Sequence, residues 1–196
     1  MKKEEIKRFL KKAWYFIWED DSILSWIVNV ILAFVLIKFV VYPGLGLLLS
    51  TSHPVVAVVS GSMEHNSNFD NWWQPQEQYY NNLGITKEQF LKFGFKNGFN
   101  KGDIMVLKGI NPENVETGNV IVYTIGGKDP IIHRVVKKWY NDSYSFQTKG
   151  DNVVIVQNFE KEINEKQLIG KAFFRIPYLG YIKIWFVELL KFVGIA

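Results

Sequence analysis

The sequence contains no cysteine. Disulfide bonds, thiolate nucleophiles and thiolate metal ligands are therefore excluded. The same absence excludes an anchored transpeptidase that works through a cysteine. It does not determine the compartment, because many exported prokaryotic domains also have no disulfide.

Histidine is scarce as well, with His53, His65 and His133 the only three. Their spacing does not match a set of metal ligands, and the chain has no glycine-rich loop that would cradle a phosphate. We therefore expect neither a metal nor an organic cofactor.

The bulk composition indicates one globular domain plus an anchor. Hydrophobic residues make up 48% of the 196 residues and charged residues 21%, which excludes a disordered chain. The net charge is +4, and much of the basic charge lies in the first twelve residues. Acidic residues interrupt these lysines and no recognition motif accompanies them, so nucleic acid is not an expected partner.

A long apolar run near the N-terminus predicts a transmembrane helix over residues 23–42. This length spans a bilayer core, and Lys38 lies near enough to its end to reach the interface. Pro43 is expected to end or kink the helix. The run is too long for a cleavable signal peptide and lacks a small-x-small cleavage site, so we expect a retained anchor.

The distribution of lysine and arginine predicts the orientation of this anchor. Six of them precede the run and almost none follow it for tens of residues. By the positive-inside rule, residues 1–22 are cytoplasmic and the bulk of the chain is extracytoplasmic.

The C-terminal residues 177–196 are also mostly apolar, but Lys183, Glu188 and Lys191 interrupt them. Three interpretations stay open: a second spanning helix, an amphipathic interfacial helix, or a helix packed on the globular domain.

Residues 43–176 predict a mainly β domain. Short β-branched and aromatic runs alternate with turn residues, which is typical of a closed or sandwiched β fold. The runs are VVAVVS, DIMVLKGI, NVIVYTI, PIIHRVVKKW, YSFQTKG and KAFFRI.

A polar and aromatic insertion over residues 65–100 interrupts this pattern. Thr86 and Gln89 form a capping-box signature, which predicts a short helix over residues 87–93 stopped by Gly94. Its aromatic residues either rest at a lipid headgroup interface or form a cluster that packs the insertion on the domain; they are Trp72, Trp73, Tyr79 and Tyr80.

Two short segments carry the chemistry of the chain. The first is Ser60-Gly61-Ser62-Met63-Glu64, just beyond the anchor, and the second is the strand-like run around His133. A serine hydroxyl is a weak nucleophile unless a neighbouring base takes its proton. The pair predicts Ser62 as nucleophile and His133 as general base.

Taken in order, the motifs SGSME, GDIMVL, GNVIVY, IIHRVV, TKGDN and IGKAFFRIPYLGYI resemble those of type I signal peptidases. The resemblance is strongest to the archaeal enzymes and to the catalytic subunits of the eukaryotic endoplasmic-reticulum complex. It covers the anchor and nearly all of the β domain, and only the insertion stands outside it.

The resemblance implies a role for each site residue. Ser62 corresponds to the nucleophile, and its backbone N–H with the Ser60 hydroxyl would line the oxyanion hole. Gly61 would let the chain approach closely between them. His133 stands where bacterial members have a lysine base, and it suits this task near neutral pH. Asp151 resembles a family aspartate that orients the base or supports the site.

The chain departs from the family pattern in three places. His65 stands where the family usually has proline, and Gln157 stands where a second aspartate is common. Asp151 is therefore the first choice for the acid of the site and Glu160 the second. Lys149 is a lower-ranked alternative base. The insertion is the third departure, which would tune access to the site or dock on lipid.

The expected function is a membrane-anchored serine endopeptidase that cleaves signal peptides from exported preproteins. The expected location is the cell membrane or an endoplasmic-reticulum-type membrane, and the expected partners are preproteins, membrane lipid and the secretion machinery. Self-cleaving LexA-like repressors share the β architecture, but they use lysine and carry a DNA-binding domain. A non-catalytic anchored β module that binds proteins is the remaining alternative.

Overall fold

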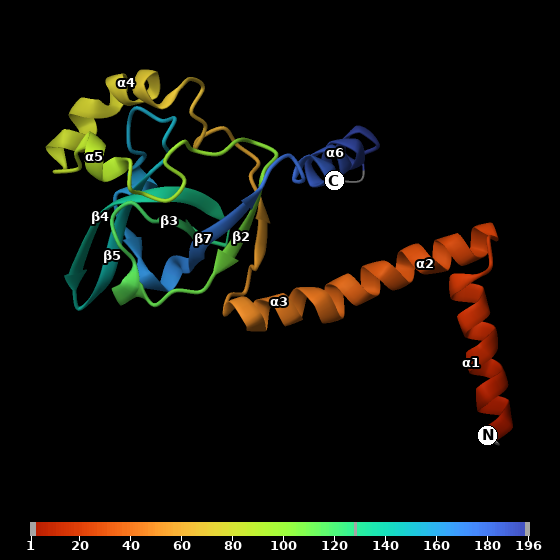
Figure 1. Cartoon of the computed structure of the whole chain (residues 1–196). Helices are drawn as coiled ribbons and strands as arrows, with labels where there is room; N and C mark the ends of the chain where they lie inside the picture. The colour runs from red at the N-terminus through yellow and green to blue at the C-terminus, as the bar shows by residue number, and fades with distance from the viewer. Residues whose placement is uncertain (1–2, 128, 195–196) are drawn as a thin grey trace. The chain divides into compact units, whose positions relative to one another are not determined.

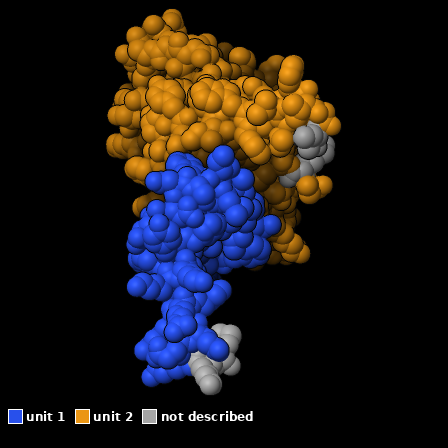
Figure 2. Space-filling view, turned by 90° about the vertical axis from the view of Figure 1, so that its right-hand side faces the viewer, with its two compact units in different colours: residues 1–48 blue, residues 49–196 orange. Residues whose placement is uncertain are grey.

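The computed structural model describes residues 3–127 and 129–194 (Figure 1). The chain divides into two compact units, residues 1–48 and residues 49–196 (Figure 2). The first unit is helical and the second carries the β-sheet.

The N-terminal unit begins with the helix α1 (Lys3–Trp18), which has no buried residue. Its end is bonded to the next helix. Ser25 Oγ donates to the Phe16 carbonyl at 2.6 Å, and Asn29 Nδ2 donates to the Ile17 carbonyl at 2.9 Å. Free carbonyls in the last turn of α1 therefore satisfy two polar side chains of the following apolar helix.

That apolar helix runs continuously from Ile23 to Leu49 and is the one described helix long and apolar enough to cross a membrane. It consists of α2 (Ile23–Leu36), a π-helical turn η1 (Ile37–Val41) and α3 (Tyr42–Leu49). The helix thus passes Pro43 rather than ending there. Proline has no N–H and crowds the carbonyl four residues earlier, which is consistent with the wider π turn just before it.

The second unit is built on one curled, seven-stranded antiparallel sheet (Figure 1). The strand order is β1-β2-β7-β3-β4-β5-β6. The mainly β prediction is confirmed, although a single sheet with β1 and β6 at its edges replaces the expected closed or sandwiched form. The strands are β1 (Val55–Ala57), β2 (Ile104–Lys108), β3 (Val120–Tyr123), β4 (Ile131–Asn141), β5 (Ser143–Lys149), β6 (Ile163–Asn164) and β7 (Leu168–Ile176).

Strand β3 is buried on both faces of the curled sheet. Val120 and Val122 pack in one buried cluster with Met105, whereas Ile121 and Tyr123 pack in another. Because β4 pairs with β3, with His133 opposite Ile121, the strand that carries this histidine lies on a rigid support. Three short 3-10 helices join the strands: η2 (Pro112–Asn114), η3 (Asn158–Glu160) and η4 (Glu165–Gln167).

The insertion folds into two helices, α4 (Phe69–Asn82) and α5 (Lys87–Phe90). The capping box of Thr86 and Gln89 is confirmed, but α5 ends at Phe90, earlier than expected. Helix α4, which contains Pro75, is not among the predicted helices. Asn68 caps this helix by accepting a hydrogen bond from the Asn71 N–H at 2.9 Å.

The aromatic residues of the insertion pack on the domain. Trp72, Trp73 and Tyr80 are buried in a cluster that includes Val136 of β4. Of the two interpretations of these aromatic residues, the packed cluster is therefore the one realised for these three. Tyr79 lies partly buried at its edge.

The C-terminal helix α6 (Tyr181–Phe192) has twelve residues. Ile184 is buried, whereas Ile182, Trp185 and Leu189 are exposed. At 1.5 Å per residue the helix is about 18 Å long, shorter than a bilayer core of about 30 Å. The three interpretations of residues 177–196 stay open, and residues 195–196 lie outside the described part of the chain.

Candidate active site

Ser62 lies in a turn that follows β1, and its neighbour anchors this turn in the core. The Met63 side chain is fully buried, and its carbonyl accepts a hydrogen bond from the Phe99 N–H at 3.0 Å. Ser62 itself is only partly buried. The turn therefore presents the hydroxyl while the core fixes the backbone beneath it.

His133 of β4 reaches this hydroxyl. Its Nε2 lies 2.9 Å from Ser62 Oγ, a hydrogen bond in which a neutral Nε2 accepts the serine proton. The His133 side chain is 9% exposed, so little water competes for this bond. The structure brings together the two residues that the sequence analysis paired.

Glu160 lies against the other side of the same ring. Its Oε1 is 2.5 Å from His133 Nδ1, and neither atom has another polar partner among the described residues. The carboxylate is fully buried, and its Oε2 accepts a hydrogen bond from the Gln157 N–H at 2.9 Å. Gln157 therefore supports the acid through its backbone at the position where the family often has an aspartate.

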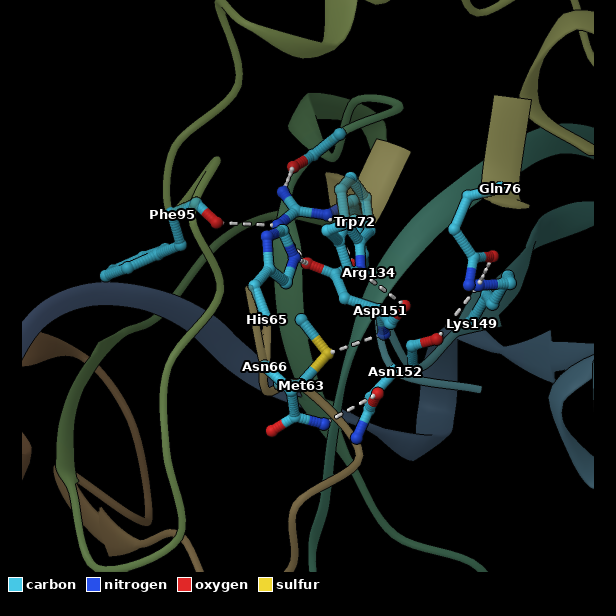
Figure 3. Close-up of polar contacts among 12 residues, drawn as sticks. Met63, His65, Asn66, Trp72, Gln76, Phe95, Arg134, Lys149, Asp151 and Asn152 are labelled. Carbon is cyan, nitrogen blue, oxygen red and sulfur yellow. Dashed lines mark hydrogen bonds and ion pairs between the residues drawn. The ribbon is translucent and has the colours of Figure 1, made fainter. Parts of the chain in front are cut away.

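Asp151, the first choice from sequence, contacts other residues. Its carboxylate forms a two-pronged ion pair with Arg134, at 2.9 Å from Nε and 2.7 Å from Nη2 (Figure 3). His65 Nε2 lies 3.1 Å from the same carboxylate. Asp151 and Arg134 are both fully buried. The Asp151 carboxylate is bonded to Arg134 and His65 inside the domain and not to the His133 ring.

The charge state of Asp151 follows from these partners. Burial by itself raises its pKa, but the charge of Arg134 and the hydrogen bonds from Arg134 and His65 outweigh burial and lower the pKa to about 2. Arg134 is not among the site residues predicted from the sequence. The available signal was a charged residue inside an apolar strand, which needs a buried acid as partner.

Lys149, the alternative base, is bonded away from Ser62. Its Nζ donates to Gln76 Oε1 at 2.9 Å and to the Gly150 carbonyl at 3.1 Å (Figure 3). Burial lowers its pKa to about 8, against the opposing effect of nearby carboxylates. The Nζ also lies 5.3 Å from the centroid of each of the Tyr79 and Tyr80 rings.

Ser60, whose hydroxyl is expected to line the oxyanion hole, lies beside Ser62. Ser60 Oγ is 3.2 Å from Ser62 Oγ. The three atoms nearest to a Cβ on Gly61 would all belong to the Glu64 side chain, whereas a Cβ on Gly150 would lie 2.8 Å from the backbone carbonyl oxygen of Ser62. It is therefore Gly150, more than Gly61, that permits the close approach of two backbone segments at this site.

No family model matches the chain. It is similar, however, to proteins named signal peptidase complex catalytic subunit SEC11. The relative from Scheffersomyces stipitis is 29% identical over 162 residues, which are 79% of this chain and 78% of the relative. The relative from Fusarium vanettenii is 28% identical over 76% of this chain and 73% of its own length.

A third relative, from Saccharomyces cerevisiae, is 30% identical over 159 residues, 76% of this chain and 75% of the relative. This level of identity, sustained over three quarters of both chains, agrees with the serine and histidine that the fold brings together. The chain belongs to the family of the signal peptidase complex catalytic subunits.

Proposed function

We propose that the chain is a membrane-anchored serine endopeptidase that removes signal peptides from exported preproteins. The observation that carries the proposal is the series of contacts from Ser62 Oγ to His133 Nε2 and from His133 Nδ1 to Glu160. A serine, a base and a buried acid in this order form the arrangement that acyl transfer needs. The family membership supports the substrate class.

In the first step, Ser62 Oγ attacks the carbonyl carbon of the scissile bond while His133 Nε2 takes the hydroxyl proton. The negative charge of Glu160 stabilises the imidazolium that forms. The Ser62 N–H and the Ser60 hydroxyl donate to the carbonyl oxygen as it becomes negative. His133 then gives its proton to the leaving amine, which frees the mature protein.

The second step releases the signal peptide, which is esterified to Ser62. His133 takes a proton from a water molecule, and the resulting hydroxide attacks the ester carbonyl. The proton returns to Ser62 Oγ, and the signal peptide leaves with a free carboxylate. Asp151 takes no part in either proton transfer, and its role is to hold Arg134 and the neighbouring loop.

The anchor would hold the β domain at the membrane surface. The helix Ile23–Leu49 would cross the membrane with the β domain on the extracytoplasmic side, where the signal peptide leaves the bilayer. The substrate would lie as an extended strand beside Ser62, with small side chains at the first and third positions before the cut. Its partners would be the preprotein, membrane lipid and other subunits of a processing complex.

The test is the processing of a preprotein with an Ala-x-Ala site by the full chain in liposomes. Wild type should release the signal peptide, and Ser62→Ala and His133→Ala should not, with the fold of each variant checked by circular dichroism. Processing by Ser62→Ala near the wild-type rate would reject the proposal. If folded wild type is inert while it still binds the preprotein, a non-catalytic binding module becomes the better account.

A further inference from the structure

Asn152 makes two hydrogen bonds to the backbone on either side of the nucleophile. Its backbone N–H donates to the Ser62 carbonyl at 2.8 Å, and its Nδ2 donates to the Gly61 carbonyl at 3.0 Å. Asn152 therefore bonds to both peptide groups that flank Ser62, and the Gly61 carbonyl also accepts a longer hydrogen bond from the Glu64 N–H, at 3.2 Å.

The shorter of the two bonds to the Gly61 carbonyl, from Asn152 Nδ2, helps to set the direction of a neighbouring N–H. The Gly61 carbonyl and the Ser62 N–H belong to the same peptide group, which is planar and trans, so they point in opposite directions. A bond that fixes the Gly61 carbonyl also fixes the Ser62 N–H. This N–H donates to no acceptor within the described chain, which leaves it free for a substrate oxygen.

Asn152 is itself held through its neighbour Asp151. The Asp151 carboxylate is bonded to Arg134, and the Asp151 N–H points to the Met63 sulfur at 3.4 Å. The Asp151 carbonyl accepts a hydrogen bond from Trp72 Nε1 at 3.1 Å (Figure 3). Trp72 belongs to α4, so the helical insertion contributes to the position of Asn152.

His65 completes this support. Its ring stacks on Trp72 with the centroids 3.7 Å apart, and it contacts the Asp151 carboxylate. The residue that stands in place of the usual family proline thus joins the insertion to the Asp151-Asn152 segment. The Asp151-Asn152 segment is therefore bonded to the insertion through Asp151 and to the Ser62 turn through Asn152.

We propose that Asn152 is a positioning residue that orients the Ser62 N–H toward the oxyanion, and that the insertion fixes Asn152 through Trp72. The inference rests on the proposed peptidase function. Donors that are aligned before the reaction stabilise the transition state without reorganisation, so a loosened Gly61–Ser62 peptide reduces turnover more than substrate binding.

The experiment compares wild type with Asn152→Ala, which removes the Nδ2 donor, and Asn152→Asp, which keeps the shape without the donor. We expect kcat to fall roughly tenfold for alanine and about 100-fold for aspartate, whose charge also opposes the oxyanion, with KM nearly unchanged. Asn82→Ala, on the exposed surface of α4, is the matched control and should match wild type.

A second measurement separates this role from general support of the fold. A peptide aldehyde with the signal-peptide sequence adds to Ser62 Oγ without a leaving group, and the oxygen of the adduct occupies the oxyanion hole. Its affinity should fall by the same factor as kcat, while preprotein binding in a Ser62→Ala background stays unchanged. Trp72→Phe, which keeps the ring without the N–H, should show a smaller loss of the same kind.

Each outcome decides a separate point. Parallel losses in kcat and aldehyde affinity support the inference. A folded Asn152→Ala variant with wild-type kcat, or one whose kcat falls while aldehyde affinity is kept, overturns it and leaves the peptidase function standing. An inert wild type rejects the proposed function, and the inference with it. If Asn152→Ala does not fold, Asn152→Asp decides by the same criteria.

Discussion

The β domain contains two buried histidine–carboxylate pairs that differ in what surrounds them. His133 faces Glu160 on one side and Ser62 on the other, and no lysine or arginine among the described residues forms an ion pair with Glu160. His65 faces Asp151, but Arg134 binds that carboxylate with two bonds. The first pair can transfer a proton to and from a nucleophile, whereas the charge of the second is already neutralised.

The comparison shows that a histidine near an acid is a weak sign of catalysis by itself. The third group in contact decides the role. On the proposed function, the His133–Glu160 pair is reactive because a hydroxyl lies at hydrogen-bond distance, and the His65–Asp151 pair is structural because it contacts a buried guanidinium and a stacked indole.

Glu160→Gln should lower kcat by about 1,000-fold with little change in KM. The loss is expected because an acid that orients the base and stabilises the imidazolium acts mainly in the transition state. Steady-state kinetics with the preprotein would measure it. Glu162→Gln, exposed two residues further on, is the control; equal activity of the two variants would remove Glu160 from the site.

Asp151→Asn should lower the free energy of unfolding by about 3 kcal/mol, because it leaves the charge of Arg134 buried without an ion pair. Turnover per folded molecule should fall far less than in Glu160→Gln. Urea denaturation would measure the loss, with Asp142→Asn in an exposed turn as the control. An unchanged unfolding midpoint would contradict the structural role of the pair.

The Asp151–Arg134 ion pair predicts how the free energy of unfolding depends on pH under acidic conditions. Since the pKa of Asp151 is lowered to about 2 from an ordinary value of 3.8, the pair stabilises the fold fully above about pH 4. This stabilisation, of about 2 kcal/mol, is lost as pH falls from about 4 to 2. Wild type should therefore lose more stability over this range than Asp151→Asn does, and parallel curves would speak against it.

His65→Phe should lower the free energy of unfolding by about 1 kcal/mol. Phenylalanine keeps an aromatic ring against Trp72 but cannot bond to the Asp151 carboxylate. Thermal unfolding would detect the change, with His53→Phe as the control. No change would mean that Arg134 alone satisfies Asp151.

Lys149→Met should leave activity unchanged, which is the smallest expected effect. Because the pKa of Lys149 is lowered to about 8 from 10.5, the folded chain releases its proton before the unfolded chain does, and stability rises with pH between about 8 and 10.5. The variant should lack this rise, whereas Lys161→Met should keep it. Loss of turnover in folded Lys149→Met would instead favour Lys149 as the base.

Much of the fold follows from local patterns that the sequence displays. Alternating apolar runs predict all strands except β6, which has only two residues, and Thr86 with Gln89 predicts the start of α5. Helix α4 could not be predicted, because Pro75 and a polar composition hide a helix whose stability comes from burying Trp72 and Trp73 on the domain.

The acid that contacts His133 could not be predicted from the sequence, for a different reason. Asp151 lies in the turn that follows β5 and belongs to the motif TKGDN, yet Glu160 reaches the His133 ring from the 3-10 turn η3. Spacing along the chain does not reveal the path of the loop that precedes η3. Arg134 gave a further clue. A buried arginine next to His133 needs an acidic partner, so Arg134 competes with His133 for Asp151.

The central claim is that Glu160 acts on Ser62 only through His133. The most direct test is a double-mutant cycle on preprotein processing with Glu160→Gln, His133→Ala and the double variant. The double variant should be as slow as His133→Ala alone, because without the base the acid has nothing to orient. If the two losses multiply instead, Glu160 acts independently of His133 and the account of the site is wrong.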